Sequence, residues 1–270
     1  MIKKEAINTL IWTREAEEAV MKAPFFVRRR VRREVEKEAA RQKASKVLLK
    51  HVTECRQKFL SGKPIASKGF QIEACFGASG CNNRANTSED LLAELEKTLT
   101  SRDMAGFLRE RTAGALKIHH EFRVCFSECP NACSRPQIAD IGIIGAVRPR
   151  VVQKECTGCA LCVSECSEDA IHIEPDSGVA LIDTSRCLLC GKCIQVCPSG
   201  AIEEAQKGWR ILAGGKLGRH PQLGKEMEGI YSSSEALRIV EGFLDIYFAQ
   251  NIGGERLGAI LNRIGYGVKS

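Results

Sequence analysis

Apolar residues recur with helical spacing over the first sixty residues. Trp12, Ala16, Ala19 and Ala23 stand four, three and four residues apart, so they share one face of a helix. A second apolar series repeats every four residues, and a third begins after Ser45, a residue type that often caps helices. These two series are Val27, Val31, Val35 and Ala39, followed by Leu48, Val52, Cys55 and Phe59. The pattern predicts three helices in residues 1–60, with Cys55 as a packed core thiol.

Short strands and helices alternate in the rest of the chain. Apolar runs predict strands over Ile138–Ile144 and from Trp209 to Leu212. Helical spacing returns at Leu91, Leu92, Leu95 and Leu99, and again over 232–246, where serines stand at the start and Leu237, Val240 and Leu244 share a face. This mixture predicts an α+β fold.

Charge is unevenly distributed along the chain. The whole sequence carries a net charge of +7, and residues 1–60 alone contain 16 Lys and Arg against 8 Glu. We interpret the arginine run of this segment as a solvated helix face; the alternative is a bidentate clamp for carboxylates or phosphates. Nucleic acid is not expected as a partner, because the segment has no helix-turn-helix pattern and few interleaved aromatics. The run consists of Arg28, Arg29, Arg30, Arg32 and Arg33.

Cysteine is the residue type in excess, with 14 copies. The start of the chain, MIKKEAINTL, lacks the continuous apolar region of a secretory signal, and no apolar run reaches the length of a membrane span. We therefore expect a cytoplasmic protein without a membrane span. In that reducing compartment the thiolates should bind metal and not form disulfides.

Two cysteine runs of identical spacing, C-x2-C-x2-C-x3-C, stand between residues 156 and 198. A cubane cluster needs four thiolates; a tight loop supplies three, and the fourth crosses over from the other run. Gly158 and Gly191 occupy loop positions where the backbone bends sharply. With an Ala-Ile pair after each run, residues 146–205 read as the two halves of a bacterial-type ferredoxin with two [4Fe–4S] clusters. The predicted ligand sets are Cys156, Cys159, Cys162 and Cys197, and Cys187, Cys190, Cys193 and Cys166.

Two further cysteine pairs lie upstream, Cys75-x5-Cys81 and Cys129-x3-Cys133. Four thiolates in two loops suffice for a third [4Fe–4S] cluster, since soft sulfur ligands select iron–sulfur clusters or zinc. From spacing alone, a zinc site of four cysteines remains the alternative. Cys125 is a spare, which we assign to strand or core packing.

The segment from Trp12 to Arg41 resembles the C-terminal domain of the B subunit of light-independent protochlorophyllide reductase. In that family the domain lies close to a tetrapyrrole, so the resemblance implies a tetrapyrrole carboxylate as partner. The matching landmarks are Trp12, Glu15, Ala16, Pro24 to Arg28, Arg32, Glu36, Ala40 and Arg41.

Residues 65–270 resemble the siroheme-containing sulfite and nitrite reductases, including the dissimilatory type. The resemblance rests on the ordered set Cys75-x5-Cys81, Cys129 to Cys133, Ile138 to Gly145, Gly214 to Pro221, Gly254 to Arg256 and Arg263 to Gly265. It implies a siroheme-reductase-type α/β domain at 61–145 and 206–270, split by the ferredoxin domain at 146–205. Residues 1–60 form the separate helical module.

The same resemblance implies roles for particular residues. In the family the two cysteine pairs hold a [4Fe–4S] cluster, and the last thiolate, here Cys133, also bridges to the siroheme iron as a catalytic link. Siroheme carries many carboxylates, so polar and cationic residues near these loops are candidate contacts. They are Arg84, Asn131, Arg135, Lys216 and Arg219.

The implied function is multi-electron reduction of a small oxyanion, sulfite to sulfide or nitrite to ammonia, with sulfite preferred. Electrons would pass from two ferredoxin clusters through the third to siroheme, and an electron-donor protein is expected as partner. The family draws substrate-binding cations largely from an N-terminal half-domain, in place of which this chain has the helical module. A second reductase subunit is therefore expected to complete the site. The alternatives are a non-catalytic electron-transfer subunit, with or without siroheme, and an enzyme acting on a tetrapyrrole.

Overall fold

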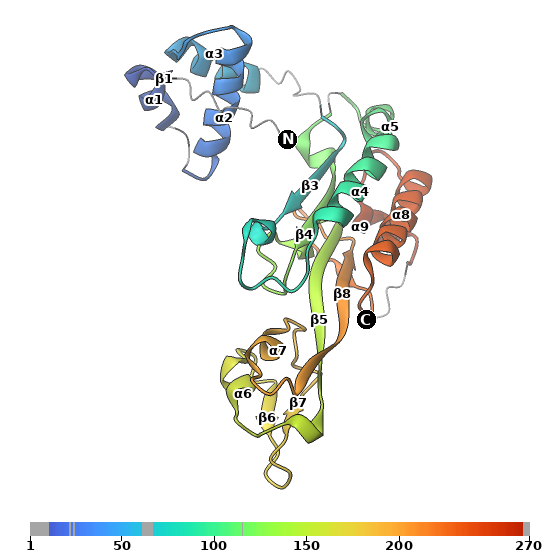
Figure 1. The fold of residues 1–270 in the computed structure, drawn as a ribbon. Coiled ribbons are helices and arrows are strands. Elements are labelled where there is room, and N and C mark those ends of the chain that lie inside the picture. The colour runs from blue at the N-terminus through green and yellow to red at the C-terminus, as the bar shows by residue number, and fades with distance from the viewer. Residues whose placement is uncertain (1–10, 22, 24, 61–66, 115, 267–270) are drawn as a thin grey trace, which may run out of the picture. The chain divides into compact units, whose positions relative to one another are not determined.

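The computed structural model describes residues 11–21, 23, 25–60, 67–114 and 116–266. The chain divides into two compact units, Met1–Ala66 and Ser67–Ser270 (Figure 1). Within the described residues, no helix is both long enough and apolar enough to cross a membrane.

The N-terminal unit contains the three expected helices. They pack around a small core of six buried residues, with Trp12, Ala19, Val31, Ala44 and Cys55 partly buried at its margin. The buried core residues are Ala16, Val20, Val35, Ala39, Val47 and Val52. The elements are β1 (Ile11–Trp12), α1 (Arg14–Met21), α2 (Phe25–Arg41), β2 (Lys46–Val47) and α3 (Leu49–Leu60).

Two details of this unit differ from the sequence expectation. Trp12 lies in β1, which pairs in parallel with β2, and not on the first helix. The third helix begins at Leu49 and is not capped by Ser45, because Lys46 and Val47 are extended in that pairing. Leu48 is 39% exposed and so does not join the apolar stripe. The side chain of Phe59, the last member of that stripe, lies outside the described residues.

Two arginines of α2 form polar contacts within the N-terminal unit. Arg28 donates to the carbonyls of Met21 and Ala23, both at 2.8 Å. Arg32 pairs with Glu17 at 3.1 Å, and its guanidinium lies 4.7 Å from the centre of the Trp12 ring. Arg28 and Arg32 thus bond within their own unit, which differs from both a solvated face and an anion clamp.

The C-terminal unit is built on a mixed five-stranded sheet with the order β3-β4-β5-β8-β9. Strands β3, β4 and β5 are parallel, whereas β8 and β9 join antiparallel. Helices pack against this sheet around one core, as Figure 1 shows for α4, α5 and α8. The strands are β3 (Phe70–Ala74), β4 (Phe122–Ser127), β5 (Ile141–Val151), β8 (Ile202–Ala213) and β9 (Lys225–Glu226), and the helices are α4 (Glu89–Ser101), α5 (Met104–Arg111), α8 (Ser233–Gln250) and α9 (Leu257–Arg263).

The predicted helices of this unit are confirmed. Leu91, Leu95 and Leu99 of α4 are at most 2% exposed, because a stripe at this spacing faces one side of a helix. Helix α8 is capped by Ser232, whose hydroxyl accepts from the N–H of Glu235, while the Glu235 carboxylate accepts from the Ser232 N–H.

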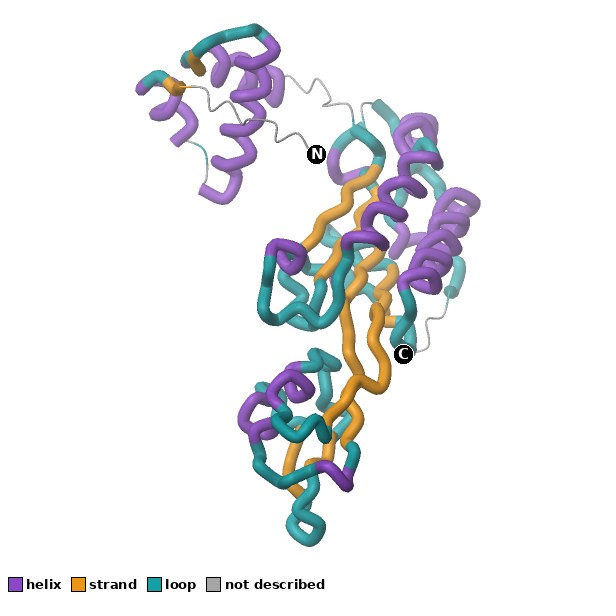
Figure 2. Tube along the Cα trace, viewed as in Figure 1, coloured by secondary structure: helices purple, strands orange, loops and turns teal. Residues whose placement is uncertain are grey.

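The long strands β5 and β8 form an antiparallel ribbon that extends beyond the sheet (Figure 2). The resemblance implies a ferredoxin domain at 146–205, but β5 continues through Pro149 to Val151, and β8 begins at Ile202. Pro149 is accommodated where the register shifts after Arg148, since proline cannot donate to a regular ladder. Ile138, expected in the strand, lies instead in a 3₁₀ turn, η3 (Pro136–Ile138).

Residues 152–201, which we call the cysteine-rich lobe, lie at the far end of this ribbon. The lobe contains helices α6 (Leu161–Glu165) and α7 (Lys192–Val196) and the hairpin β6 (Ile171–Ile173) and β7 (Ala180–Ile182). Its core includes the buried Cys162 and Cys193.

Candidate iron–sulfur centres

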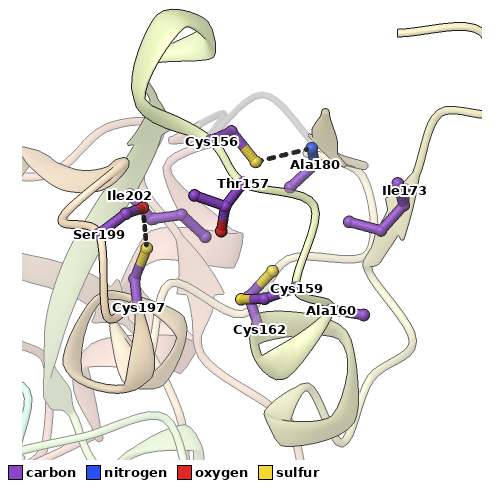
Figure 3. Close-up of a pocket in the computed structure, with 10 residues that line it drawn as sticks. All are labelled: Cys156, Thr157, Cys159, Ala160, Cys162, Ile173, Ala180, Cys197, Ser199 and Ile202. Atoms are coloured by element: carbon purple, nitrogen blue, oxygen red, sulfur yellow. Dashed lines mark hydrogen bonds between the residues drawn. The ribbon is translucent and has the colours of Figure 1, made fainter. Parts of the chain in front are cut away.

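A hollow in the cysteine-rich lobe is surrounded by four thiols (Figure 3). Cys156, Cys159 and Cys162 come from the first cysteine run, and Cys197 comes from the second. Ile173 and Ile202 also line the hollow. The backbone N–H of Ala180 donates to Cys156 Sγ at 3.4 Å. The fold thus brings together the four cysteines of the first predicted set.

The second predicted set also lies together in the lobe. Burial raises the pKa of Cys193 to about 12, and the neighbouring thiols of Cys190 and Cys187 act in the same direction, with smaller effects from Cys162 and Cys166. Cys166 is therefore close to the second run although it belongs to the first. Its sulfur accepts from the N–H of Ala170 at 3.4 Å.

The donor chemistry of these groups fits iron–sulfur clusters. Each offers four soft thiolates, and backbone N–H groups point at their sulfurs, which is how proteins stabilise and tune such clusters. Within the described residues, no group of three or more His, Cys, Asp or Glu side chains is arranged around a single metal ion. A cubane cluster is wider than one ion, so this finding concerns single-ion sites only.

A third group of thiols lies at one edge of the central sheet. Strands β3 and β4 are parallel neighbours in register from Phe70–Phe122 to Ala74–Phe126. Because their carboxyl ends meet, the loop carrying Cys75 and Cys81 starts beside the loop carrying Cys129 and Cys133. The Cys75 N–H extends the ladder by donating to the Phe126 carbonyl at 3.0 Å.

Local contacts bring these four thiols together. Burial raises the pKa of Cys129; the Asn131 N–H opposes this, and the thiols of Cys75, Cys133 and Cys81 add to it. The N–H groups of Gly77 and Glu128 donate to Cys75 Sγ at 3.4 and 3.3 Å. Cys129 is buried, whereas Cys81 and Cys133 are exposed. The two pairs are therefore neighbours in space although about fifty residues separate them.

Glu128 holds the two loops together, a role that sequence analysis missed. Its side chain is 2% exposed and accepts from both the N–H and the hydroxyl of Ser88, at 2.8 and 2.7 Å. Its backbone carbonyl accepts from Ala85 and Asn86 at 2.8 and 3.0 Å. A Cβ at Gly77 would lie 2.0 Å from the Glu128 carboxylate, so this turn requires glycine for close packing.

The candidate siroheme contacts lie on loops around this edge. Arg84, Asn131, Arg135 and Arg219 are exposed, and Lys216 is half-buried. The 214–224 hairpin, which carries Lys216 and Arg219, packs on η3 next to Arg135, where the Gly224 N–H donates to the Gln137 carbonyl at 2.7 Å. Within the part of the chain that the structure describes, none of Arg84, Arg135, Lys216 and Arg219 forms an ion pair. These cations are thus available to an anionic ligand.

Cys125 packs inside β4, as expected for the spare cysteine, and its thiol should be inert. Burial raises the pKa of this thiol to about 11, and the Glu73 carboxylate acts in the same direction. At about pH 8 it is therefore protonated and a poor nucleophile.

We expect iodoacetamide to leave Cys125 unmodified in the folded chain and to label it after unfolding in urea, as read by peptide mass spectrometry. Exposed Cys133 in iron-depleted protein is the control; equal labelling of both thiols in the folded chain would contradict the prediction.

The fold and these thiol groups place the chain in the class of iron–sulfur proteins. Residues 70–268 match the family model of the nitrite and sulphite reductase 4Fe-4S domain. Residues 12–56 match that of the proto-chlorophyllide reductase 57 kD subunit. The chain belongs to the nitrite and sulfite reductase 4Fe–4S domain family, with a protochlorophyllide-reductase-like segment before it, so both resemblances are confirmed.

Several relatives of known name are sulfite reductases. The chain is 33% identical over 196 residues to the coenzyme F420-dependent sulfite reductase of Methanocaldococcus jannaschii, in a match that covers 72% of this chain and 29% of that protein. It is 26% identical to the C subunit of the anaerobic sulfite reductase of Salmonella typhimurium, over 60% of this chain and 44% of that one. The chain therefore spans less than half the length of these relatives.

The fold also resembles a solved structure. The crystal structure of dissimilatory sulfite reductase I matches with a TM-score of 0.53 at 17% identity, covering 82% of this chain and 56% of that one. At this identity the likeness concerns the fold alone. It confirms a mixed α/β fold of the sulfite reductase type.

Proposed function

We propose that the chain is a siroheme and [4Fe–4S] oxidoreductase that reduces a small oxyanion, with sulfite as the preferred substrate. The observation that carries this proposal is the group of four thiols at the edge of the β3–β4 pair. Two of them, Cys81 and Cys133, are exposed at the surface where unpaired cations gather. A cluster held there would be anchored on the buried side by Cys129 and would present Cys133 outward.

Each group of residues at this edge has a distinct task in the proposal. Cys75, Cys81, Cys129 and Cys133 hold the third cluster, and Cys133 links it to the siroheme iron. Arg84, Arg135, Lys216 and Arg219 bind and orient the siroheme carboxylates, and Asn131 contributes a polar contact, because guanidinium and ammonium groups pair well with carboxylates. Siroheme, when bound, supplies an iron at which the oxyanion is reduced. Residues 61–145 and 206–270 form the domain for this site.

The cysteine-rich lobe supplies electrons in this proposal. Its two sets of four cysteines hold two [4Fe–4S] clusters, each of which carries one electron at a time. We assign residues 146–205 to this ferredoxin domain and residues 1–60 to the separate helical module. An electron-donor protein reduces the lobe, and further cations for the substrate site come from a second subunit of the reductase. The name of the Salmonella relative, which is one subunit of a sulfite reductase, supports a multi-subunit assembly.

An optical spectrum of anaerobically purified protein tests the proposal. The chain should be produced in cells that make siroheme, and we expect a Soret band and red-region heme bands above the iron–sulfur absorption. Because the iron must be open to substrate, adding sulfite to the reduced protein should shift these bands. Iron–sulfur absorption from about twelve irons for three clusters, without heme bands, would overturn the reductase proposal for this chain.

A non-catalytic electron-transfer subunit is the second candidate, favoured by the short length of the chain relative to its sulfite reductase relatives. In that case the chain would carry three clusters but show no sulfite turnover with reduced methyl viologen. Addition of a catalytic partner would restore turnover. Turnover by the chain alone would exclude this candidate.

A further inference from the structure

Where the β5–β8 ribbon leaves the central sheet, the cysteine-rich lobe contacts β5 through the second of its two cysteine runs. The N–H of Val147 in β5 donates to the carbonyl of Leu189 at 2.8 Å, and Val147 also bridges to Cys190. Both lobe residues belong to the second run. This contact lies where the ribbon leaves the sheet, beside the loop that carries Cys129.

A small apolar cluster links this run directly to the third group of thiols. Ala85, Cys129 and Val147 are buried together, and Ile194 of α7 packs against them. Ile194 follows Cys193 in sequence and also packs in the lobe core. One side chain thus reaches from the second cysteine run to the surroundings of Cys129.

Comparison of the two cysteine runs shows how this contact favours glycine at position 191. Ala160 and Gly191 occupy equivalent positions, directly after the second cysteine of each run, and have similar backbone angles, with φ of 59° and 73°. The conformation therefore tolerates a Cβ in the first run. In the second run, a Cβ at Gly191 would lie 3.1 Å from Val147 Cβ. At Gly191 the close approach of Val147 therefore adds to the positive φ as a reason for glycine.

Residues of the first cysteine run are exposed to solvent near its second cysteine. Cys159 is exposed, and Leu161 beside it is 48% exposed. The hollow that these cysteines surround is lined by lobe residues, Thr157, Ala160 and Ser199 among them, and by Ile202 at the start of β8.

We propose that the three clusters are ordered, with the cluster of Cys187, Cys190, Cys193 and Cys166 between the other two. This inner cluster passes electrons to the cluster of Cys129 across the Val147–Ile194 contact, and the cluster of Cys156, Cys159, Cys162 and Cys197 is the outer one. In each transfer the inner cluster loses one electron and the third cluster gains it. No bond forms or breaks, and no proton moves. A low-potential one-electron donor replaces the lost electron. The inference rests on the proposed function, because it takes Cys129 as a cluster ligand.

Electron paramagnetic resonance of the anaerobic, dithionite-reduced chain tests the order. The unpaired spins of two reduced clusters that lie close together split each other's resonance signals. We therefore expect the signal of the third cluster to be split in the unaltered chain. Cys190→Ala should abolish this splitting by removing the inner cluster. Its counterpart Cys159→Ala, at the equivalent position of the first run, should leave the splitting in place. The reverse result, or an unsplit signal in the unaltered chain, would overturn the order.

A second pair of variants tests the contact without removing a ligand. Gly191→Ala should crowd Val147, whose Cβ would lie 3.1 Å from the new Cβ, and so weaken the splitting. Gly200→Ala is the matched control, because Gly200 also has a positive φ, 71°, but has open space around it. Equal splitting in both variants would show that the Val147 contact does not set the cluster separation.

The outcomes separate this inference from the proposed function. Three signals with the expected splitting but no heme bands would support the order and overturn the siroheme proposal. About eight irons, as two clusters require, with no third signal would overturn both.

Discussion

Replacement of Cys133 by alanine is expected to remove one whole cluster and leave the other two intact. Iron content should fall from about twelve to about eight per chain, since a cubane cluster contains four irons and needs four thiolates. The lobe cysteines lie in a separate core, so their two clusters should be unaffected. If the chain binds siroheme, its heme bands should also be lost or strongly altered, because the proposed link to the iron is the Cys133 sulfur.

The control for this prediction is Cys125→Ala. Cys125 lies in the neighbouring strand β4 and is buried, but it is not among the thiols that surround Cys129. The control should retain about twelve irons. Iron and sulfide analysis of anaerobically purified proteins reports the count. Full iron content in Cys133→Ala would show that this thiol holds no cluster.

Asp140→Asn is expected to destabilise the C-terminal unit by about 3–5 kcal/mol, the usual effect of leaving one partner of a buried ion pair alone. The Asp140 side chain is fully buried and binds Arg256 through both carboxylate oxygens, with the shortest contact at 2.6 Å. It also accepts from the N–H groups of Arg123 and Leu257, at 2.8 and 3.2 Å. Asparagine would leave Arg256 uncompensated at 17% exposure and turn an amide N–H₂ towards these donors.

The unfolding of this unit can be followed by the fluorescence of Trp209, which is fully buried in its core. The chain has two tryptophans, so Trp12→Phe makes Trp209 the single reporter. The control is Asp245→Asn, which breaks the exposed pair with Arg102 and should cost less than about 1 kcal/mol. Similar urea midpoints for Asp140→Asn and this control would contradict the prediction.

The ion pair also gives a structural role to two sequence motifs that lie far apart along the chain. Asp140 belongs to the segment from Ile138 to Gly145, and Arg256 ends the segment from Gly254. The structure joins them, so that the N-terminal end of α9 is held to the start of β5. Both motifs contribute to the family resemblance, but nothing in their local pattern indicates that they meet.

Features governed by residues close in sequence were predicted well. The stripe of Leu91, Leu95 and Leu99 specified a helix, and the serines at 232–234 indicated where α8 begins. Where local signals competed with strand pairing, prediction was less accurate. Ser45 suggested a cap, but the pairing of Lys46 and Val47 with β1 delayed the helix, and strands β5 and β8 run past the expected domain bounds at 146 and 205.

The sequence by itself determined the chemistry: which thiols are spaced as cluster ligands, and to which family the order of motifs belongs. Ligand spacing and helical periodicity are properties of neighbouring residues, so they can be read along the chain. Only the tertiary structure decided that Asp140 meets Arg256, and that Val147 meets the second cysteine run and not the first. These contacts depend on strand register and close packing between distant segments, which the pattern of a single segment does not specify.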